Sequence, residues 1–236
     1  MSSLRKVEPV RFPVMIQGWR YISFLHWNYP VETVAGLLPA GLTVDTFEGS
    51  AWVGITPFIL TGLRPPFLPP LPWISRFPET NCRTYVRGPD GSPGVWFFSL
   101  DAARLAAVAA ARATYGLPYA WSRMDVRIRR DVFTYRAERR WPDGRSGYEI
   151  AIQRGRPVQT RDLEAFLTAR FRLYSVIAGR LVTARVEHPP WPLESARALN
   201  VTETLTTAAG LGPPQGLPLA HFSVGVQTRV GRPELV

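Results

Sequence analysis

Apolar and polar residues alternate along most of this chain with the two-residue period that is typical of β-strands. Short segments of this kind, rich in β-branched and aromatic residues, are separated by turn residues such as those at 48–50 and 89–92. Strands joined by short turns usually pair in antiparallel fashion. We therefore predict a mainly antiparallel sheet, with strands at residues 19–27, 42–47, 51–60, 80–87, 94–100, 179–188 and 219–230 and a long hairpin pattern over 125–141 and 147–154.

Helical periodicity is confined to a few segments. Asp101 is suited to cap a helix over residues 102–115, which Gly116 and the following Pro118 would end. A second helix is predicted over 161–176, because its apolar residues recur at intervals of three and four. Shorter helices are expected at 30–38 and 202–209.

The proline-rich stretch at residues 64–73 cannot pair in the centre of a sheet, because proline lacks the amide hydrogen that a sheet needs. It predicts an ordered loop packed by its own Phe and Trp, or a lid. No repeat or internal linker divides the 236 residues, and all-β barrels of this length fold as single units. We expect one domain over 1–236, with 1–12 as an N-terminal tail.

Composition excludes several classes of protein. No window approaches the roughly 18 uninterrupted apolar residues of a spanning helix, and no apolar run follows the first ten residues, so we expect a cytoplasmic protein with no membrane role. The single cysteine, Cys82, allows no internal disulfide and no Cys-based zinc cluster, and we expect it to be a small buried apolar residue. Three histidines far apart have no metal-ligand spacing, so neither a metal nor another cofactor is expected.

The formal charge of +10 suggests nucleic acid as a possible partner, because basic surfaces attract phosphate. The basic residues are scattered, however, and all except Lys6 are arginines. Their densest group, at 127–140, falls on expected neighbouring strands, where solvated charges are common. Charge alone therefore gives little support for nucleic-acid binding.

Five motifs occur along the chain in an order that resembles a known family: FLHW at 24–27, LPAGL at 38–42, AWVG at 51–54, FPETNCRTYV at 77–86 and HPPWPL at 188–193. Together they resemble the YqjF-like family of uncharacterised bacterial proteins, a distant branch of the acetoacetate-decarboxylase superfamily. The resemblance implies an α+β, mainly antiparallel fold: a closed, cone-shaped β-barrel with flanking helices and an internal ligand cavity. It leaves open whether the chain forms a homo-oligomer.

The decarboxylase of that superfamily forms a Schiff base between a lysine and its ketone substrate, and a second lysine lowers the pKa of the first. The matching run here is 115–120, where Tyr119 and Ala120 stand in place of the two lysines. Lys6, in the expected tail, is the only lysine of the chain. The resemblance therefore implies a related barrel without Schiff-base decarboxylation.

Two further positions match active-site residues of the decarboxylase, Arg20 and Glu79, while a second glutamate position falls near Thr56. Side chains two apart share one face of a strand, so Arg20 would be accompanied by His26, and Glu79 by Asn81 and Arg83. We predict a partly apolar cavity for a small carboxylated or oxygenated molecule. The planar fork of an arginine would hold the anionic group of this molecule. The candidate catalytic residues are Glu79 and Tyr119, and the candidate binding residues are Arg20, His26, Asn81 and Arg83.

Each candidate also has a purely structural interpretation. Arg20 and Glu79 would serve equally as a buried ion pair, His26 as a core histidine, and Tyr119 as a space-filling side chain. His188 is expected to fix a turn or to pack on Trp191. Three functions remain open: an acid–base enzyme, a non-catalytic sensor or carrier, and, with least support, a nucleic-acid-binding barrel.

Overall fold

The computed structural model describes residues 9–236, so most of the expected tail, including Lys6, lies outside the described residues. The helices are α1 (Val31–Ala35), α2 (Leu105–Tyr115), α3 (Asp162–Thr168) and α4 (Leu205–Ala208). The strands are β1 (Met15–Tyr29), β2 (Thr43–Val44), β3 (Ala51–Arg64), β4 (Arg76–Arg87), β5 (Pro93–Ala102), β6 (Tyr119–Arg129), β7 (Val132–Trp141), β8 (Gly147–Pro157), β9 (Arg172–Ile177), β10 (Arg180–Glu187), β11 (Leu193–Glu203), β12 (Leu219–Val230) and β13 (Glu234–Leu235).

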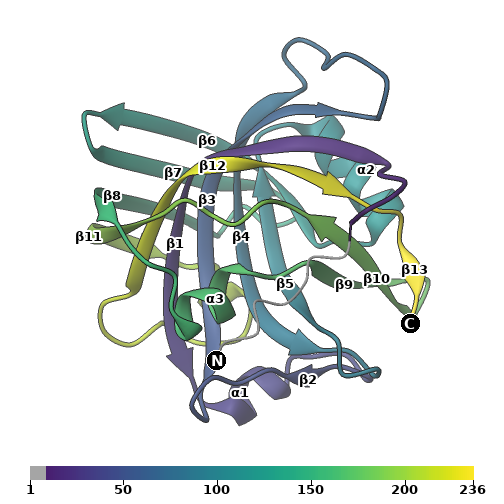
Figure 1. Cartoon of the computed structure of the whole chain (residues 1–236). Coiled ribbons are helices and arrows are strands. Elements are labelled where there is room, and N and C mark those ends of the chain that lie inside the picture. The colour runs from purple at the N-terminus through teal and green to yellow at the C-terminus, as the bar shows by residue number, and fades with distance from the viewer. Residues whose placement is uncertain (1–8) are drawn as a thin grey trace.

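The strands form one continuous sheet that closes on itself (Figure 1). Pairing of β4 with β5 closes a nine-stranded barrel in the order β5-β6-β7-β8-β11-β12-β1-β3-β4. The barrel is mixed, because β5 and β6 run parallel while most other pairs are antiparallel. Pairing of β10 with β12 closes a second ring, in which β9 and β10 join the shared strands β12, β1, β3, β4 and β5. The expected α+β fold with a closed β-barrel is confirmed.

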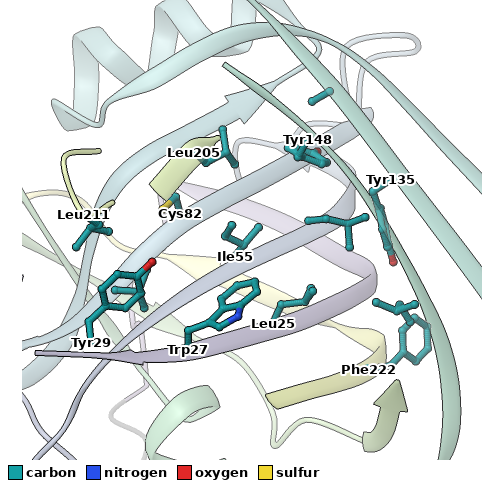
Figure 2. Close-up of a cluster of buried hydrophobic side chains, with 14 of the residues drawn as sticks. Leu25, Trp27, Tyr29, Ile55, Cys82, Tyr135, Tyr148, Leu205, Leu211 and Phe222 are labelled. Atoms are coloured by element: carbon teal, nitrogen blue, oxygen red, sulfur yellow. The ribbon is translucent and has the colours of Figure 1, made fainter. Parts of the chain in front are cut away.

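The shared strands are buried on both faces, which explains why their sequences contain long apolar stretches. On β1, Leu25 and Trp27 point into the nine-stranded barrel, where they pack with residues such as Ile55, Cys82 and Phe222 (Figure 2). Their neighbours on β1, among them Phe24, face the other ring. Cys82 is a free, buried thiol within the apolar cluster, as expected from the sequence. The strand pair β1–β3 therefore separates two cores.

Three secondary-structure predictions were wrong in part, and one strand was missed. The helix expected over 161–176 ends at Thr168, and the rest forms β9, which pairs with β10 and β5. The hairpin pattern over 125–141 is two strands, β6 and β7, and β11 was not predicted. Helix α2 starts at Leu105 with Arg104 as its cap, because Asp101 lies in β5 and pairs with Arg139 at 2.8 Å.

The proline-rich segment connects β3 to β4 as the expected loop, but its aromatic residues do not pack it. Phe67 and Trp73 are both exposed to solvent. Within residues 9–236, no helix combines the length and the apolar character that crossing a bilayer requires.

Candidate functional site

A cavity of about 90 Å³ lies between the apolar clusters of the second ring. This volume is several times the space that one water molecule needs. The walls come from strands of that ring, from α2 and from the start of β6, and most of them are apolar or aromatic. Their polar or ionisable side chains belong to Gln17, Trp19, Glu79, Asn81, Arg83, Tyr115, Tyr119, Thr168, Arg170, Arg172, His188 and Trp191.

Tyr119 reaches the cavity because of the way α2 ends. Gly116 closes the helix with a positive φ of 61°, and a Cβ atom at that position would lie 2.3 Å from the carbonyl oxygen of Val176. Only glycine fits both the conformation and the space. The chain then passes Pro118 and enters β6 at Tyr119, opposite Leu100 of β5.

Glu79 and Tyr119 form a hydrogen-bonded pair on the cavity wall. The Tyr119 hydroxyl donates to Oε1 of Glu79 at 3.1 Å, and Oε2 has no partner among the described residues. Burial raises the pKa of Glu79 to about 8, because the charged form loses its hydration. Burial and the nearby Glu79 also raise the pKa of Tyr119. Both groups are therefore mainly protonated near neutral pH.

Arg83 and Asn81 follow Glu79 along the same face of β4, as the alternation predicted. The Arg83 guanidinium lies 5.8 Å from the ring centres of both Phe24 and Tyr85 and donates to the carbonyl oxygen of Leu167 at 3.3 Å. Its Nε and Oδ1 of Asn81 have no hydrogen-bond partner within residues 9–236. In that part of the chain no carboxylate forms an ion pair with Arg83. An uncompensated cation therefore lines the cavity.

The prediction that Arg20 points into the barrel was wrong. Arg20 is exposed, and the pairing of β1 with β3 shifts register directly after it. Tyr21 has a positive φ of 52°, and this irregularity reverses the alternation of side chains along β1. Trp19 and Ile22 consequently both face the cavity, and Arg20 faces away from it. The proposed ion pair between Arg20 and Glu79 is also ruled out.

His26 is buried, as predicted, but it supports the cavity from behind instead of lining it. Its Nε2 lies 2.6 Å from the Tyr85 hydroxyl, which donates to the carbonyl oxygen of Leu167 at 2.7 Å. Because that hydroxyl has only one hydrogen, Nε2 of His26 must be the donor in their bond. Burial and the nearby Arg83 hold the pKa of His26 well below its usual value. His26 is therefore a neutral residue that orients Tyr85 beside Arg83.

Several cavity residues were not found from the sequence. Arg170 and Arg172 line the cavity, but they lie in the segment that was predicted as a helix. That prediction gave no reason to place their side chains in the same cavity as those of β4. Arg170 pairs with Asp45 at 2.6 Å and stacks on Phe166. His188 packs on Trp191 with ring centres 5.0 Å apart, as expected, but it also lines the cavity.

Burial lowers the pKa of His188, so this imidazole is neutral near pH 7. In the described part of the chain, no three His, Cys, Asp or Glu side chains are grouped so that they could hold a metal ion. The described cavity residues thus offer hydrogen-bond donors and acceptors, an arginine without an ion pair and a mainly neutral carboxyl group.

Comparison with solved structures identifies the fold. An acetoacetate decarboxylase from Legionella pneumophila subsp. pneumophila str. Philadelphia 1 is 10% identical, with a TM-score of 0.68 over 99% of this chain and 92% of that chain. The enduracididine biosynthesis enzyme MppR, in a complex with pyruvate, is 13% identical, with a TM-score of 0.66 over 99% of this chain and 93% of that chain. At these identities the likeness establishes the fold alone.

Sequence comparison is more specific. The uncharacterized protein YqjF of Bacillus subtilis (strain 168) is 36% identical over 216 residues, which cover 89% of this chain and 87% of YqjF. The model of the family DUF2071, described as an uncharacterized conserved protein (COG2071), matches residues 16–227. Both findings confirm the resemblance drawn from the five sequence motifs. The chain belongs to the DUF2071 family, is a relative of YqjF and has the acetoacetate-decarboxylase-like fold.

Proposed function

We propose that this protein binds a small keto or hydroxy carboxylic acid in its barrel cavity and acts on it by acid–base chemistry through Glu79, without forming a Schiff base. The observation that carries the proposal is the neutral Glu79 carboxyl, held by Tyr119 on a cavity wall that also contains the unpaired Arg83. The same strand thus supplies a proton donor and an anion-binding group.

The unpartnered atoms on the cavity wall define the complementary ligand. Arg83 has a free Nε–H, and protonated Glu79 has a free hydroxyl at Oε2, so two hydrogen-bond acceptors are required. Oδ1 of Asn81 accepts a hydrogen bond, so a hydroxyl or enol would satisfy it. A buried guanidinium without a counter-ion is costly, and a carboxylate is the partner that fits its geometry. A carboxylate with a second oxygen nearby fulfils all three requirements.

Glu79 is suited to give a proton to the carbonyl oxygen of such a ligand. With a pKa of about 8 it is mainly protonated at neutral pH, and a catalytic acid works best when its pKa lies near the working pH. When the proton leaves, the Tyr119 hydroxyl already donates to the carboxylate that forms. The expected reaction class is enolisation, in which Glu79 protonates the carbonyl oxygen while the hydrogen on the adjacent carbon leaves to a water molecule, or an addition or elimination that starts from this enol.

No lysine occurs in residues 9–236, so none of the described residues offers the cavity an amine for Schiff-base chemistry. Lys6 is the only lysine of the chain, and Tyr119 stands where the resemblance places the catalytic lysine. The complex of MppR with pyruvate supports a keto acid as the ligand class, although that protein shares only the fold with this chain. We further expect the protein to act in the cytoplasm, where a free thiol such as Cys82 stays reduced.

A sensor or carrier is the second candidate, because the same residues would bind a ligand without changing it. The separation of Glu79 from Arg20 favours the enzyme: a carboxyl locked in an ion pair would have no proton to give, whereas this one is neutral and faces a cavity. A nucleic-acid partner has less support, because the proposed ligand-binding arginine, Arg83, faces the cavity.

Two measurements test the proposal. A panel of small keto, hydroxy and aromatic acids should raise the melting temperature in proportion to the logarithm of concentration above Kd. Stabilising keto acids should then exchange the hydrogens next to their carbonyl group with D₂O, and Glu79→Gln should abolish this exchange while preserving the thermal shift. A thermal shift without exchange would indicate a carrier, and no shift across the whole panel would refute the ligand class.

A further inference from the structure

The loop between β3 and β4, residues 65–75, has an unusual surface. It contains no charged residue, and most of its side chains are apolar and exposed. Phe67 is 104% exposed and Trp73 is 86% exposed, so neither packs against the body of the protein. In Figure 1 the loop is the blue segment that projects at the top of the view. The exposed apolar side chains are Phe67, Leu68, Leu71, Trp73 and Ile74.

The backbone of this loop holds the two aromatic residues outward. Phe67 and Trp73 have φ angles of 67° and 72°, a conformation that is uncommon for residues other than glycine. The loop is tied to the rest of the chain where Arg104 Nε donates to the Trp73 carbonyl oxygen at 2.7 Å and Ser75 Oγ donates to that of Leu63 at 2.9 Å. These bonds hold the end of the loop next to the apolar tip, which lowers the entropy cost of binding through it.

The charged residues at the two ends of the loop, and the one that is bonded to its backbone, are all positive. Arg64 and Arg76 stand at its two ends, and Arg104 is bonded to its backbone. The sequence contains no Asp or Glu at residues 49–78, which include the whole loop, or at 102–124, which include α2. Two copies of the loop would repel each other, whereas an anionic surface would attract it.

We propose that loop 65–75 binds the surface of a bilayer that contains anionic lipids, with its Phe, Trp and Leu side chains in the interfacial region and its flanking arginines at the headgroups. Aromatic side chains prefer that region, and adjacent arginines add attraction to anionic headgroups. Such binding needs no spanning helix. It therefore revises the sequence-based expectation of no membrane role, which rested on the absence of spanning segments.

Vesicle co-sedimentation of the full chain tests this proposal. The protein should sediment with vesicles of phosphatidylcholine and phosphatidylglycerol, and much less with phosphatidylcholine alone or at high salt. Phe67→Ser/Trp73→Ser should lower the partition coefficient by about tenfold or more, and Arg76→Gln should lower it by a smaller factor. Leu217→Ser is the matched apolar control, since Leu217 is 90% exposed in a different loop. Arg180→Gln, at an exposed strand end, is the matched charge control.

The outcomes are decisive because folding is checked separately. Circular dichroism and melting temperature should show that Phe67→Ser/Trp73→Ser folds, and Leu68→Ser/Leu71→Ser provides a second variant of the tip if it does not. Equal sedimentation of wild type and tip variants, or no sedimentation at all, would overturn the proposal. So would light scattering that shows an oligomer lost in the tip variants without any vesicle binding, because the loop would then join copies of the chain.

Discussion

Replacing Glu79 with Gln removes a buried carboxyl group whose pKa the fold raises from its usual 4.5 to about 8. Gln has nearly the same size and is neutral at every pH. In the wild type, the folded state binds this proton more tightly than the unfolded state, so raising the pH favours unfolding. The stabilising contribution is complete below about pH 4.5 and is lost as the pH rises through about 8.

The size of the effect follows from the two pKa values. The difference between about 8 and 4.5, at 1.36 kcal/mol for each pH unit, gives a total of about 5 kcal/mol. Between about pH 5 and about pH 8.5, the wild type should lose roughly 4 kcal/mol that Glu79→Gln retains. Glu79 is only 4% exposed, so solvent screening reduces this figure little.

Urea unfolding at several pH values, followed by circular dichroism, measures the effect. As the pH rises above about 5, the free energy of unfolding of the wild type should fall, whereas Glu79→Gln should not show this loss. The difference between the two proteins should therefore shift in favour of the variant. Glu138→Gln is a suitable control, because Glu138 is exposed and pairs only with the exposed Arg140 among the described residues. It should follow the wild type at every pH.

A constant difference between wild type and Glu79→Gln across this range would refute the reasoning. It would mean that Glu79 is ionised in the folded protein, with a counter-ion or water that stabilises its charge. An ionised Glu79 would have no proton to give near neutral pH, so its proposed role as a proton donor would also be refuted.

Three further predictions follow from the site and its surroundings. The thermal shift produced by small carboxylic acids should be lost in Arg83→Gln but preserved in Arg20→Gln, and loss in both or in neither would contradict the assignment. Borohydride reduction with acetoacetate should leave no adduct in mass spectra, since an imine requires an amine; an adduct anywhere except Lys6 or the N-terminal amine would contradict this. Arg139→Gln should lower the free energy of unfolding by about 3–5 kcal/mol in urea denaturation, because Asp101 would remain buried without its cation, and a loss below about 1 kcal/mol would disprove the importance of the pair.

Where the strand geometry is regular, local patterns in the sequence were sufficient to predict which side chains share a face. The alternation along β4 correctly placed Glu79, Asn81 and Arg83 on one face, because β4 keeps its period over these residues. Gly116 and Pro118 correctly marked the end of α2. The five family motifs identified the barrel. The run at 115–120 led to Tyr119 as a candidate site residue, and Tyr119 does line the cavity.

Long-range pairing decided the features that the sequence did not reveal. Arg20 was misplaced because the irregularity at Tyr21 depends on how β1 fits between β3 and β12, where Gly225 also has a positive φ. The segment after Thr168 suits a helix by its apolar spacing, but pairing with β10 and β5 makes it a strand. That error also concealed Arg170 and Arg172 as cavity residues.

Glu79 shows most clearly which properties the sequence determines and which depend on the tertiary structure. The position of Glu79 and its neighbours on β4 follow from the order of residues in the sequence. With the ordinary carboxyl pKa of 4.5, Glu79 would be ionised at pH 7. Its protonation does not follow from that order, because the rise in pKa comes chiefly from burial by residues distant in sequence, and Tyr119, its hydrogen-bond donor, lies 40 residues away. The sequence thus determined which groups were available, and the closure of the barrel determined their charge, because desolvation depends on everything that surrounds a side chain.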